Sequence, residues 1–260
     1  MSIEETWDYL CEHPGATLEE IQAGIGPKSS AIRDINNMKR KAAKDPHIDK
    51  IIDTSGHLKA KGEYVRYWLS WAANPRKPIK EIREVLETSP GRVLVLDVET
   101  TGLDKDTDKI LSLSIINGDG RLLYDGLFNP APIQHWEAAQ RINKISPDMV
   151  RDKPTISEEA GRIQKILDLG SAILGYNTRF DTGFIKASGL WIHPAIPIYD
   201  LMYDFAQIYG EYSEYFQDYT WQKLTTCAEY YGVRFNAHRS AEDVRATLEC
   251  TKRLLSRLDY

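Results

Sequence analysis

An apolar run that continues into two carboxylates constrains this chain more than any other stretch. Residues 93–96 read Val-Leu-Val-Leu, which predicts a strand buried on both faces. Asp97 and Glu99 continue that strand, and because side chains alternate along a strand, both carboxylates point to one face. Two like charges in a dry sheet repel each other and lose solvation. A divalent cation would explain them, since oxygen ligands suit Mg²⁺ or Mn²⁺. The alternative is a strand end that emerges into solvent.

The length and composition indicate a two-domain protein of the cell interior. The chain has 260 residues, of which 42% are hydrophobic and 27% charged, so a sizeable core is possible. Its three cysteines have no metal-ligand spacing, and the first residues lack the pattern of a signal peptide. We therefore expect a cytoplasmic, reducing location and no membrane partner, because no apolar run approaches the roughly 20 residues that span a bilayer. The net charge of −5 does not itself indicate nucleic-acid binding.

Residues 1–72 predict a small α+β domain that resembles a winged helix-turn-helix. Three helical segments precede two strand-like segments, at residues 3–12, 17–24, 29–43, 48–53 and 64–69. The third helix is basic, so nucleic-acid contact is one interpretation. The candidate contacts are Lys28, Arg33, Lys39 and Arg40. The other interpretations are a solvated charged face or a module that binds a protein partner.

A linker with one short helix is expected at residues 73–90, and a second domain at residues 91–260. Strands after the acidic one are expected at residues 110–116, 122–128, 171–175 and 196–200. Helices are expected at residues 134–142, 155–169, 178–187, 201–209, 220–231 and 240–257. Antiparallel strands followed by alternating strands and helices predict an α/β domain with a mixed five-stranded sheet flanked by helices.

Three further polar residues have ordinary explanations when each is taken alone. Asp181 falls in the first turn of an expected helix, where an acid complements the helix dipole. Ser240 is a suitable N-cap, and Asp243 three residues later could be the acid of a capping box. His238, just before that helix, reads as a surface histidine. Their order and combination with the acidic strand carry more information than any one of them.

Three segments in this order resemble the motifs of the DEDDh 3′→5′ exonucleases. They are Asp97-Val98-Glu99-Thr100-Thr101-Gly102-Leu103, then Asn177-Thr178-Arg179-Phe180-Asp181, then His238 with Asp243. This superfamily includes the epsilon subunit of DNA polymerase III, ribonuclease T and the TREX exonucleases. The resemblance covers about residues 91–257 and implies a ribonuclease H-like fold. One departure is Gly175-Tyr176 before Asn177, where the epsilon subunit has a histidine; we expect it to affect a neighbouring contact.

The resemblance also implies a role for each residue of these motifs. Two Mg²⁺ (or Mn²⁺) ions would be held by Asp97, Glu99, Asp181 and Asp243, with Asp97 bridging both and Asp181 often acting through water. His238 would take a proton from the attacking water. The 3′ end would meet Thr100, Thr101, Gly102 and Leu103, and Asn177 would support the site near the scissile phosphate.

The function predicted from the sequence is metal-dependent 3′→5′ hydrolysis of single-stranded nucleic acid, which releases nucleoside 5′-monophosphates. DNA is favoured over RNA, although the same carboxylates serve both. Proofreading and free-standing trimming or DNA repair both remain open, and we expect a free-standing enzyme, because no polymerase tether is evident after the last helix. The alternative is a winged-helix regulator that carries an inactive exonuclease scaffold. Metal-dependent nucleotide release, abolished by Asp97→Ala, would discriminate between them.

Overall fold

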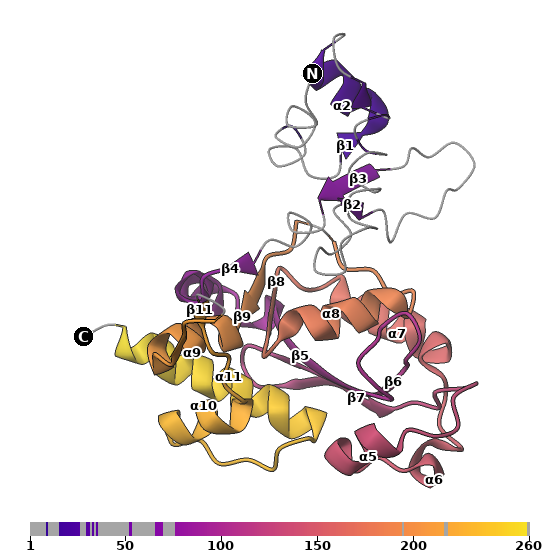
Figure 1. The fold of residues 1–260 in the computed structure, drawn as a ribbon, viewed down its shortest axis with the longest axis vertical. Coiled ribbons are helices and arrows are strands. Elements are labelled where there is room, and N and C mark those ends of the chain that lie inside the picture. Colours follow the sequence, from indigo (N-terminus) through magenta and orange to yellow (C-terminus); the bar gives the residue numbers. More distant parts are fainter. Residues whose placement is uncertain are drawn as a thin grey trace. The chain divides into compact units, whose positions relative to one another are not determined.

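The structure is a computed structural model, shown in Figure 1. It describes residues 9, 16–26, 30, 31, 33, 35, 52–53, 66–69, 76–193, 195–215 and 218–258. The chain divides into two compact units, which are described separately. One contains Met1–Arg76 with His193–Pro197, and the other contains Lys77–Ile192 with Ile198–Tyr260. No helix in the described part of the chain combines the length and the hydropathy that a membrane span requires.

The N-terminal unit contains a small antiparallel sheet and a short helix. β3 (Arg66–Leu69) pairs with β1 (Ala16–Thr17) on one side and with β2 (Ile52–Asp53) on the other. α2 (Leu18–Ile25) follows β1 directly and buries Ile21. The helix α2 and the strands β2 and β3 agree in order with the predicted second helix and the two predicted strands, whereas β1 was not predicted.

The basic segment of the N-terminal unit is described at a few positions. Ala31 and Ile35 are helical and buried, four residues apart on one helix face, whereas Arg33 is exposed. The remaining candidate contacts, Lys28, Lys39 and Arg40, lie outside the described residues. The winged helix and its contact with nucleic acid therefore stay predictions.

A mixed sheet forms the centre of the second unit, as the sequence predicts. The acidic strand lies in the middle, antiparallel to one neighbour and parallel to the other. In sheet order the strands are β4 (Arg76–Lys77), β9 (Ile198–Asp200), β8 (Ala172–Gly175), β5 (Val93–Thr100), β6 (Ile110–Asn117) and β7 (Leu122–Leu127). The sixth strand, β4, was not predicted: it has two residues with no apolar alternation, and Pro78 directly after it has no N–H to extend the pairing.

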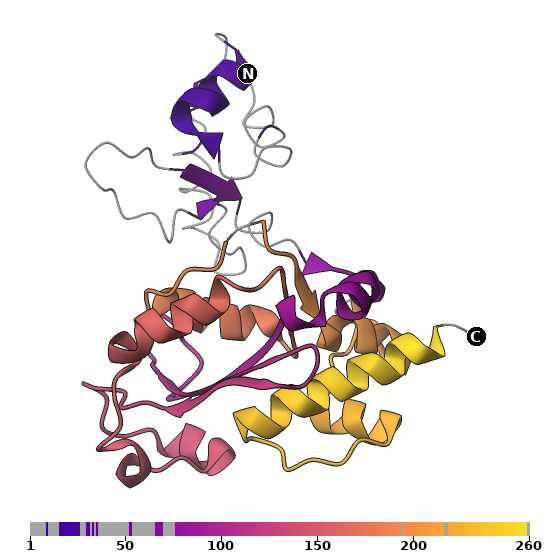
Figure 2. The ribbon, with the colours of Figure 1, turned by 180° about the vertical axis from the view of Figure 1, so that it is seen from behind.

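Helices cover both faces of this sheet (Figures 1 and 2). Val93 and Val95 share a hydrophobic core with residues of α10 (Leu224–Tyr231) and α11 (Ser240–Arg257). Leu94 and Leu96 alternate to the other face, where α7 (Ile156–Leu167) and α8 (Thr178–Ala187) lie. Gly170, which follows α7, approaches Leu94 so closely that an added Cβ would lie 2.7 Å from its side chain.

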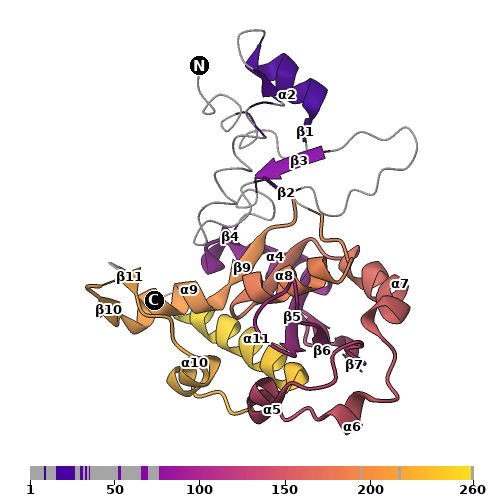
Figure 3. The same cartoon turned by 45° about the vertical axis from the view of Figure 1, so that its right-hand side comes forward.

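The remaining elements are short and connect this framework. They are η1 (Ile79–Ile82), α4 (Arg83–Thr88), η2 (Pro90–Arg92), α5 (Glu137–Asn143), α6 (Pro147–Val150), α9 (Leu201–Tyr209), β10 (Tyr212–Ser213) and β11 (Asp218–Tyr219). The prediction of a helix from residue 220 is wrong in its first turn, because α10 begins at Leu224. The β10–β11 hairpin precedes it (Figure 3). Tertiary contacts hold residues 220–223 in a loop: the Tyr176 hydroxyl donates to the carbonyl of Gln222, and the Trp221 ring packs edge-on to Tyr203.

Candidate active site

The two carboxylates of the central strand lie where its buried face opens. β5 pairs in parallel with β8 only as far as Val95, whereas its pairing with β6 continues and sets Asp97 opposite Ser114 and Glu99 opposite Ser112. The pairing becomes irregular between Glu99 and Thr100. Asp97 and Glu99 are half-buried, unlike the fully buried valines that precede them on the same face. The two acids therefore lie where the strand leaves the core and reaches the edge of the unit.

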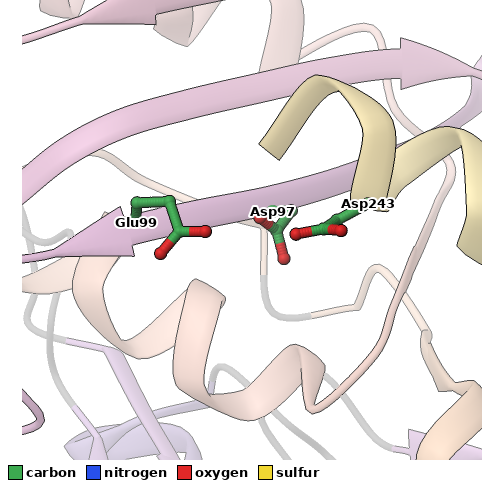
Figure 4. Close-up of side chains that lie close together, drawn as sticks. All are labelled: Asp97, Glu99 and Asp243. Atoms are coloured by element: carbon green, nitrogen blue, oxygen red, sulfur yellow. The ribbon is translucent and has the colours of Figure 1, made fainter. Parts of the chain in front are cut away.

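A third carboxylate joins this pair from a distant part of the sequence. Asp243 lies in the first turn of α11, and Figure 4 shows its carboxylate facing that of Asp97. One oxygen from each of Asp97, Glu99 and Asp243 lies within 4.8 Å of the others. Two oxygens of this group, Oδ2 of Asp97 and Oδ1 of Asp243, are buried and accept no hydrogen bond from the described residues. Buried carboxylate oxygens without a donor are costly, so this donor set fits a divalent cation.

Burial and mutual repulsion raise the pKa values of these acids. The pKa of Asp97 is raised well above its ordinary value, first by burial and then by the charges of Asp181, Asp243 and Glu99. Burial, with the charge of Asp243, raises the pKa of Glu99 to about 7. Burial also raises the pKa of Asp243 to about 7, although backbone N–H groups of His238 and Arg239 oppose the rise. A cation would replace the protons that this cluster otherwise retains near neutral pH.

The fourth predicted ligand, Asp181, lies outside the three-acid group but next to it. It is buried in the first turn of α8, and its Oδ1 accepts a 2.9 Å hydrogen bond from the backbone N–H of Val98. β8 no longer pairs with β5 at Val98, so the carboxylate takes the place of a missing strand partner. Burial raises the pKa of Asp181, and its charge is the largest one acting on Asp97. Its direct partner in this structure is thus the strand itself.

The predicted base, His238, contacts the site through its backbone N–H. Its N–H donates to Oδ2 of Asp243 at 3.1 Å, and its φ of 65° is in the left-handed region. The side chain is exposed. This turn sets the start of α11, and the N-cap is Arg239, so the prediction of Ser240 as the N-cap is wrong. The Ser240 hydroxyl bonds instead to Ser112 and Ser114 of β6.

The segment after Glu99 forms a tight loop with one apolar side chain projecting from it. Thr101 Oγ1 donates to Asp108 Oδ1 at 2.9 Å, and a Cβ on Gly102 would lie 2.3 Å from Oδ2 of that carboxylate, so a larger residue there would displace the Asp108 side chain. The side chains of Thr100 and Thr101 are buried and hold the loop together. Leu103, by contrast, is 87% exposed. Of the predicted substrate contacts here, Leu103 is the side chain that is free to meet a ligand.

A pocket of about 320 Å³ lies between this loop and α8. It is lined by Leu103, Asp104, Lys105, Arg179, Phe180 and Phe184. The Phe180 and Phe184 rings pack together with their centroids 4.8 Å apart, and the Lys105 stem approaches Gly183 of α8. The pocket thus combines aromatic surface with two basic side chains, and it connects the loop after Glu99 with the helix that carries Asp181.

Two residues to which sequence analysis gave no role build the frame of the site. Asp200, at the end of β9, accepts the backbone N–H groups of Asn177 and Thr178, both at 2.9 Å. It thereby holds the left-handed Asn177 and the start of α8, whereas the Asn177 side chain is exposed. Asn143 donates to the carbonyl of Thr100 at 3.2 Å. An Asp directly before a helix was a usable signal for the first residue, and nothing in the sequence indicated the second.

Comparison with known proteins assigns this part of the chain to a family. Residues 94–251 match the model of the RNase_T exonuclease family. The chain belongs to this family. The match includes all five residues predicted to be catalytic. The exonuclease superfamily proposed from the motifs is thereby confirmed, and the metal-dependent chemistry of such exonucleases agrees with the acidic group.

Relatives with known names support the same assignment over part of their length. The chain is 29% identical over 177 residues to a DNA polymerase III PolC-type protein of Caldanaerobacter subterraneus subsp. tengcongensis, and 25% identical over 172 residues to one of Clostridium perfringens. These matches cover 65% and 64% of this chain but only 12% and 11% of the relatives.

Solved structures show the same fold. The zinc-bound complex of E. coli exonuclease I with single-stranded DNA matches with a TM-score of 0.52 at 22% identity, over 64% of this chain and 41% of that one. The complex of E. coli exonuclease I with a 5cy-dT13 oligonucleotide matches with a TM-score of 0.53 at 21% identity, over the same shares of the two chains. This likeness confirms the predicted ribonuclease H-like architecture of the second unit.

Proposed function

We propose that this exonuclease is a divalent-metal-dependent enzyme that removes nucleotides from the 3′ end of single-stranded DNA. One observation carries the proposal: Asp97, Glu99 and Asp243 bring carboxylate oxygens within 4.8 Å of one another, and two buried oxygens of this group have no donor among the described residues. A strand and a helix hold the three carboxylates close together although their negative charges repel one another, and a bound cation would offset that repulsion. Family membership and the exonuclease I fold support the same activity.

The residues of the site divide the chemistry between them. We assign Asp97, Glu99, Asp243 and Asp181 to the binding of two Mg²⁺ or Mn²⁺ ions, with Asp181 held in place by Val98. The bound ions would activate the attacking water and stabilise charge on the leaving oxygen. His238 accepts the proton of that water at its imidazole. The water would attack the phosphorus that joins the terminal nucleoside to the rest of the strand, and the bond from that phosphorus to the 3′ oxygen of the preceding nucleotide would break. The products are a nucleoside 5′-monophosphate and a strand that ends in a 3′ hydroxyl.

The pocket beside the acids supports a single-stranded substrate. Leu103 projects from its loop, where it would meet a terminal base, and Phe180 offers a ring on which a base could stack. Lys105 and Arg179 supply positive charge for phosphate groups. DNA is favoured over RNA in this proposal, in keeping with the names of the relatives, which are DNA polymerase III and exonuclease I complexes with DNA. The 3′ end of the DNA would also contact backbone groups of Thr100, Thr101, Gly102 and Asn177.

A digestion series tests the proposal. Single-stranded DNA, duplex DNA with a 3′ overhang, a primer with a mispaired 3′ end and RNA, each labelled at the 5′ end, are incubated with Mg²⁺, Mn²⁺ or EDTA. We expect a ladder that shortens from the 3′ end of single-stranded DNA and disappears in EDTA. Preferential removal of the mispaired end would support proofreading, and indifference to it would support trimming or repair.

The same series separates the enzyme from a regulator with an inactive scaffold. If no substrate is shortened with either metal, while the intact chain still binds DNA, the exonuclease proposal fails. The binding role predicted for the N-terminal unit would then be the principal activity. A protein partner of that unit would be sought only in this case.

His238→Ala is expected to lower the rate of hydrolysis by about 10²-fold or more, the usual effect of losing a general base. Because the imidazole is not assigned as a ligand, binding of Mn²⁺ should remain. Single-turnover digestion and Mn²⁺ titration measure the two effects. His135→Ala is the matched control, since that histidine is also exposed and has no predicted role in the site. A rate unchanged by His238→Ala would exclude this residue as the base.

Leu103→Ala is expected to weaken the use of single-stranded DNA several-fold, mainly by raising KM. Full burial of a leucine side chain contributes about 1.5–3 kcal/mol, and a base against one side of Leu103 buries only part of it. The side chain is exposed, so the melting temperature should not change. Steady-state kinetics on an oligothymidylate measure the effect. Leu169→Ala, which removes another exposed leucine far along the chain, is the control. Equal KM values for Leu103→Ala and the control would rule out the contact with the terminal base.

A further inference from the structure

Three buried serine hydroxyls form a chain between β6 and the start of α11. Ser240 Oγ lies 2.7 Å from Ser112 Oγ and 2.7 Å from Ser114 Oγ. Ser114 Oγ also donates to Oδ1 of Asp125 on β7, at 2.7 Å. All three serines are buried, and the two on β6 alternate with leucine and isoleucine residues of that strand. A buried hydroxyl is unfavourable unless it forms a hydrogen bond. The hydrogen bonds among these serines therefore offset the cost of burying them.

The carboxylate at the end of this chain determines the direction of every hydrogen bond in it. A carboxylate only accepts, so the proton of Ser114 points to Asp125. Ser114 must then accept from Ser240, whose single proton is used in that bond. Ser240 in turn accepts from Ser112. Each hydroxyl has one assigned donor role, and the bonds polarise one another along the chain.

The chain of hydroxyls links the two elements that carry the acidic group. Ser114 is directly opposite Asp97, and Ser112 is directly opposite Glu99, so their side chains share one face of the sheet. Ser240 is in the same helical turn as Asp243. The hydroxyls thus join the strand beside two of the carboxylates to the helix turn that supplies the third. Ser240 is also the residue that, contrary to the sequence prediction, does not cap its helix.

We propose that Ser240 is a positioning residue for the metal site, which holds Asp243 at its distance from Asp97 and Glu99 through Ser112, Ser114 and Asp125. This inference rests on the proposed function, because it assigns a role towards the cation that the acids would bind. Without the hydroxyl, the first turn of α11 loses its polar attachment to β6, and the Asp243 carboxylate is less well held against the repulsion of its neighbours.

Direct titration of the full chain with Mn²⁺, by calorimetry and without substrate, tests this role. Ser240→Ala is expected to raise the apparent dissociation constant for Mn²⁺ about tenfold, the scale on which residues that orient ligands act. Excess Mn²⁺ should then restore most of the turnover. Asp125 is the exposed residue at the end of the serine hydrogen-bond network. Asp125→Ala should also raise the dissociation constant for Mn²⁺, whereas Asp125→Asn, which keeps an acceptor oxygen, should bind Mn²⁺ like the wild type.

A control on the same helix separates positioning from general stability. Thr251→Ala removes another buried hydroxyl of α11, one that donates to the carbonyl of Thr247 at 2.9 Å, two turns beyond Asp243. It should leave the Mn²⁺ constant unchanged even if the melting temperature falls. Equal Mn²⁺ constants for Ser240→Ala and the wild type would overturn the inference while the proposed function stands. Failure of the wild-type chain to bind Mn²⁺ would overturn both.

Discussion

Asp97→Asn is expected to reduce 3′-end hydrolysis on the order of a thousandfold, and to raise the melting temperature of the metal-free protein. The loss of rate follows because Asp97 occupies the centre of the acidic group, between Glu99 and Asp243 (Figure 4). The gain in stability follows because burial and three neighbouring acids oppose its charge. A neutral side chain of the same shape removes that repulsion, and each 1 kcal/mol gained would raise the melting temperature by about 2–4 °C.

Two measurements on one preparation test this pair of effects. Digestion of labelled single-stranded DNA gives the rate, and thermal unfolding in EDTA at about pH 8 gives the stability. Asp152→Asn, at an exposed position away from the group, is the matched control and should change neither. A variant with nearly wild-type rate would contradict the assignment of Asp97. A fall in its metal-free melting temperature would show that the group is stabilised by contacts other than a cation.

The metal-free protein is expected to lose stability as the pH rises from about 4.5 to about 7, and to regain it when Mg²⁺ is added. Burial raises the pKa values of Glu99 and Asp243 to about 7 from ordinary values of 4.5 and 3.8. Within that window the folded state retains protons that the unfolded state has released. The free energy of unfolding therefore falls with rising pH, by at most about 1.4 kcal/mol per pH unit for each group. The contribution is complete below the unfolded pKa values and is lost above pH 7.

Melting temperatures between pH 5 and pH 8, in EDTA and in Mg²⁺, measure this effect. Because the cation competes with protons, the rise in melting temperature on adding Mg²⁺ should be largest above about pH 7. Asp243→Asn removes one of the groups whose pKa is raised to about 7 and should make the decline in EDTA shallower. A rise produced by Mg²⁺ that has the same size at pH 5 and at pH 8 would mean that the cation binds elsewhere.

Strands and helices of the second unit could be predicted from the periodicity of the sequence, because local preference and tertiary packing agree there. The apolar run at residues 93–96 and the alternating run at 110–116 are strands in the structure, and the predicted bounds of α8, α9 and α11 are confirmed. In each of these helices the apolar pattern marks the face that packs against the sheet. Where packing overrides local preference the prediction failed, as at residues 220–223, where a tyrosine hydroxyl and an aromatic contact hold a loop.

The sequence by itself determined which residue types the site contains and in what order. Two carboxylates in one buried strand are unstable without a ligand, and that physical fact does not depend on the rest of the fold. Only the tertiary structure decided which acids meet. It placed Asp243 within 4.8 Å of Asp97 and Glu99, and directed Asp181 to the backbone of Val98. It also turned Ser240 from an expected cap into a link with β6. Such contacts join residues more than eighty positions apart, and no local pattern encodes the packing of a helix on a particular strand.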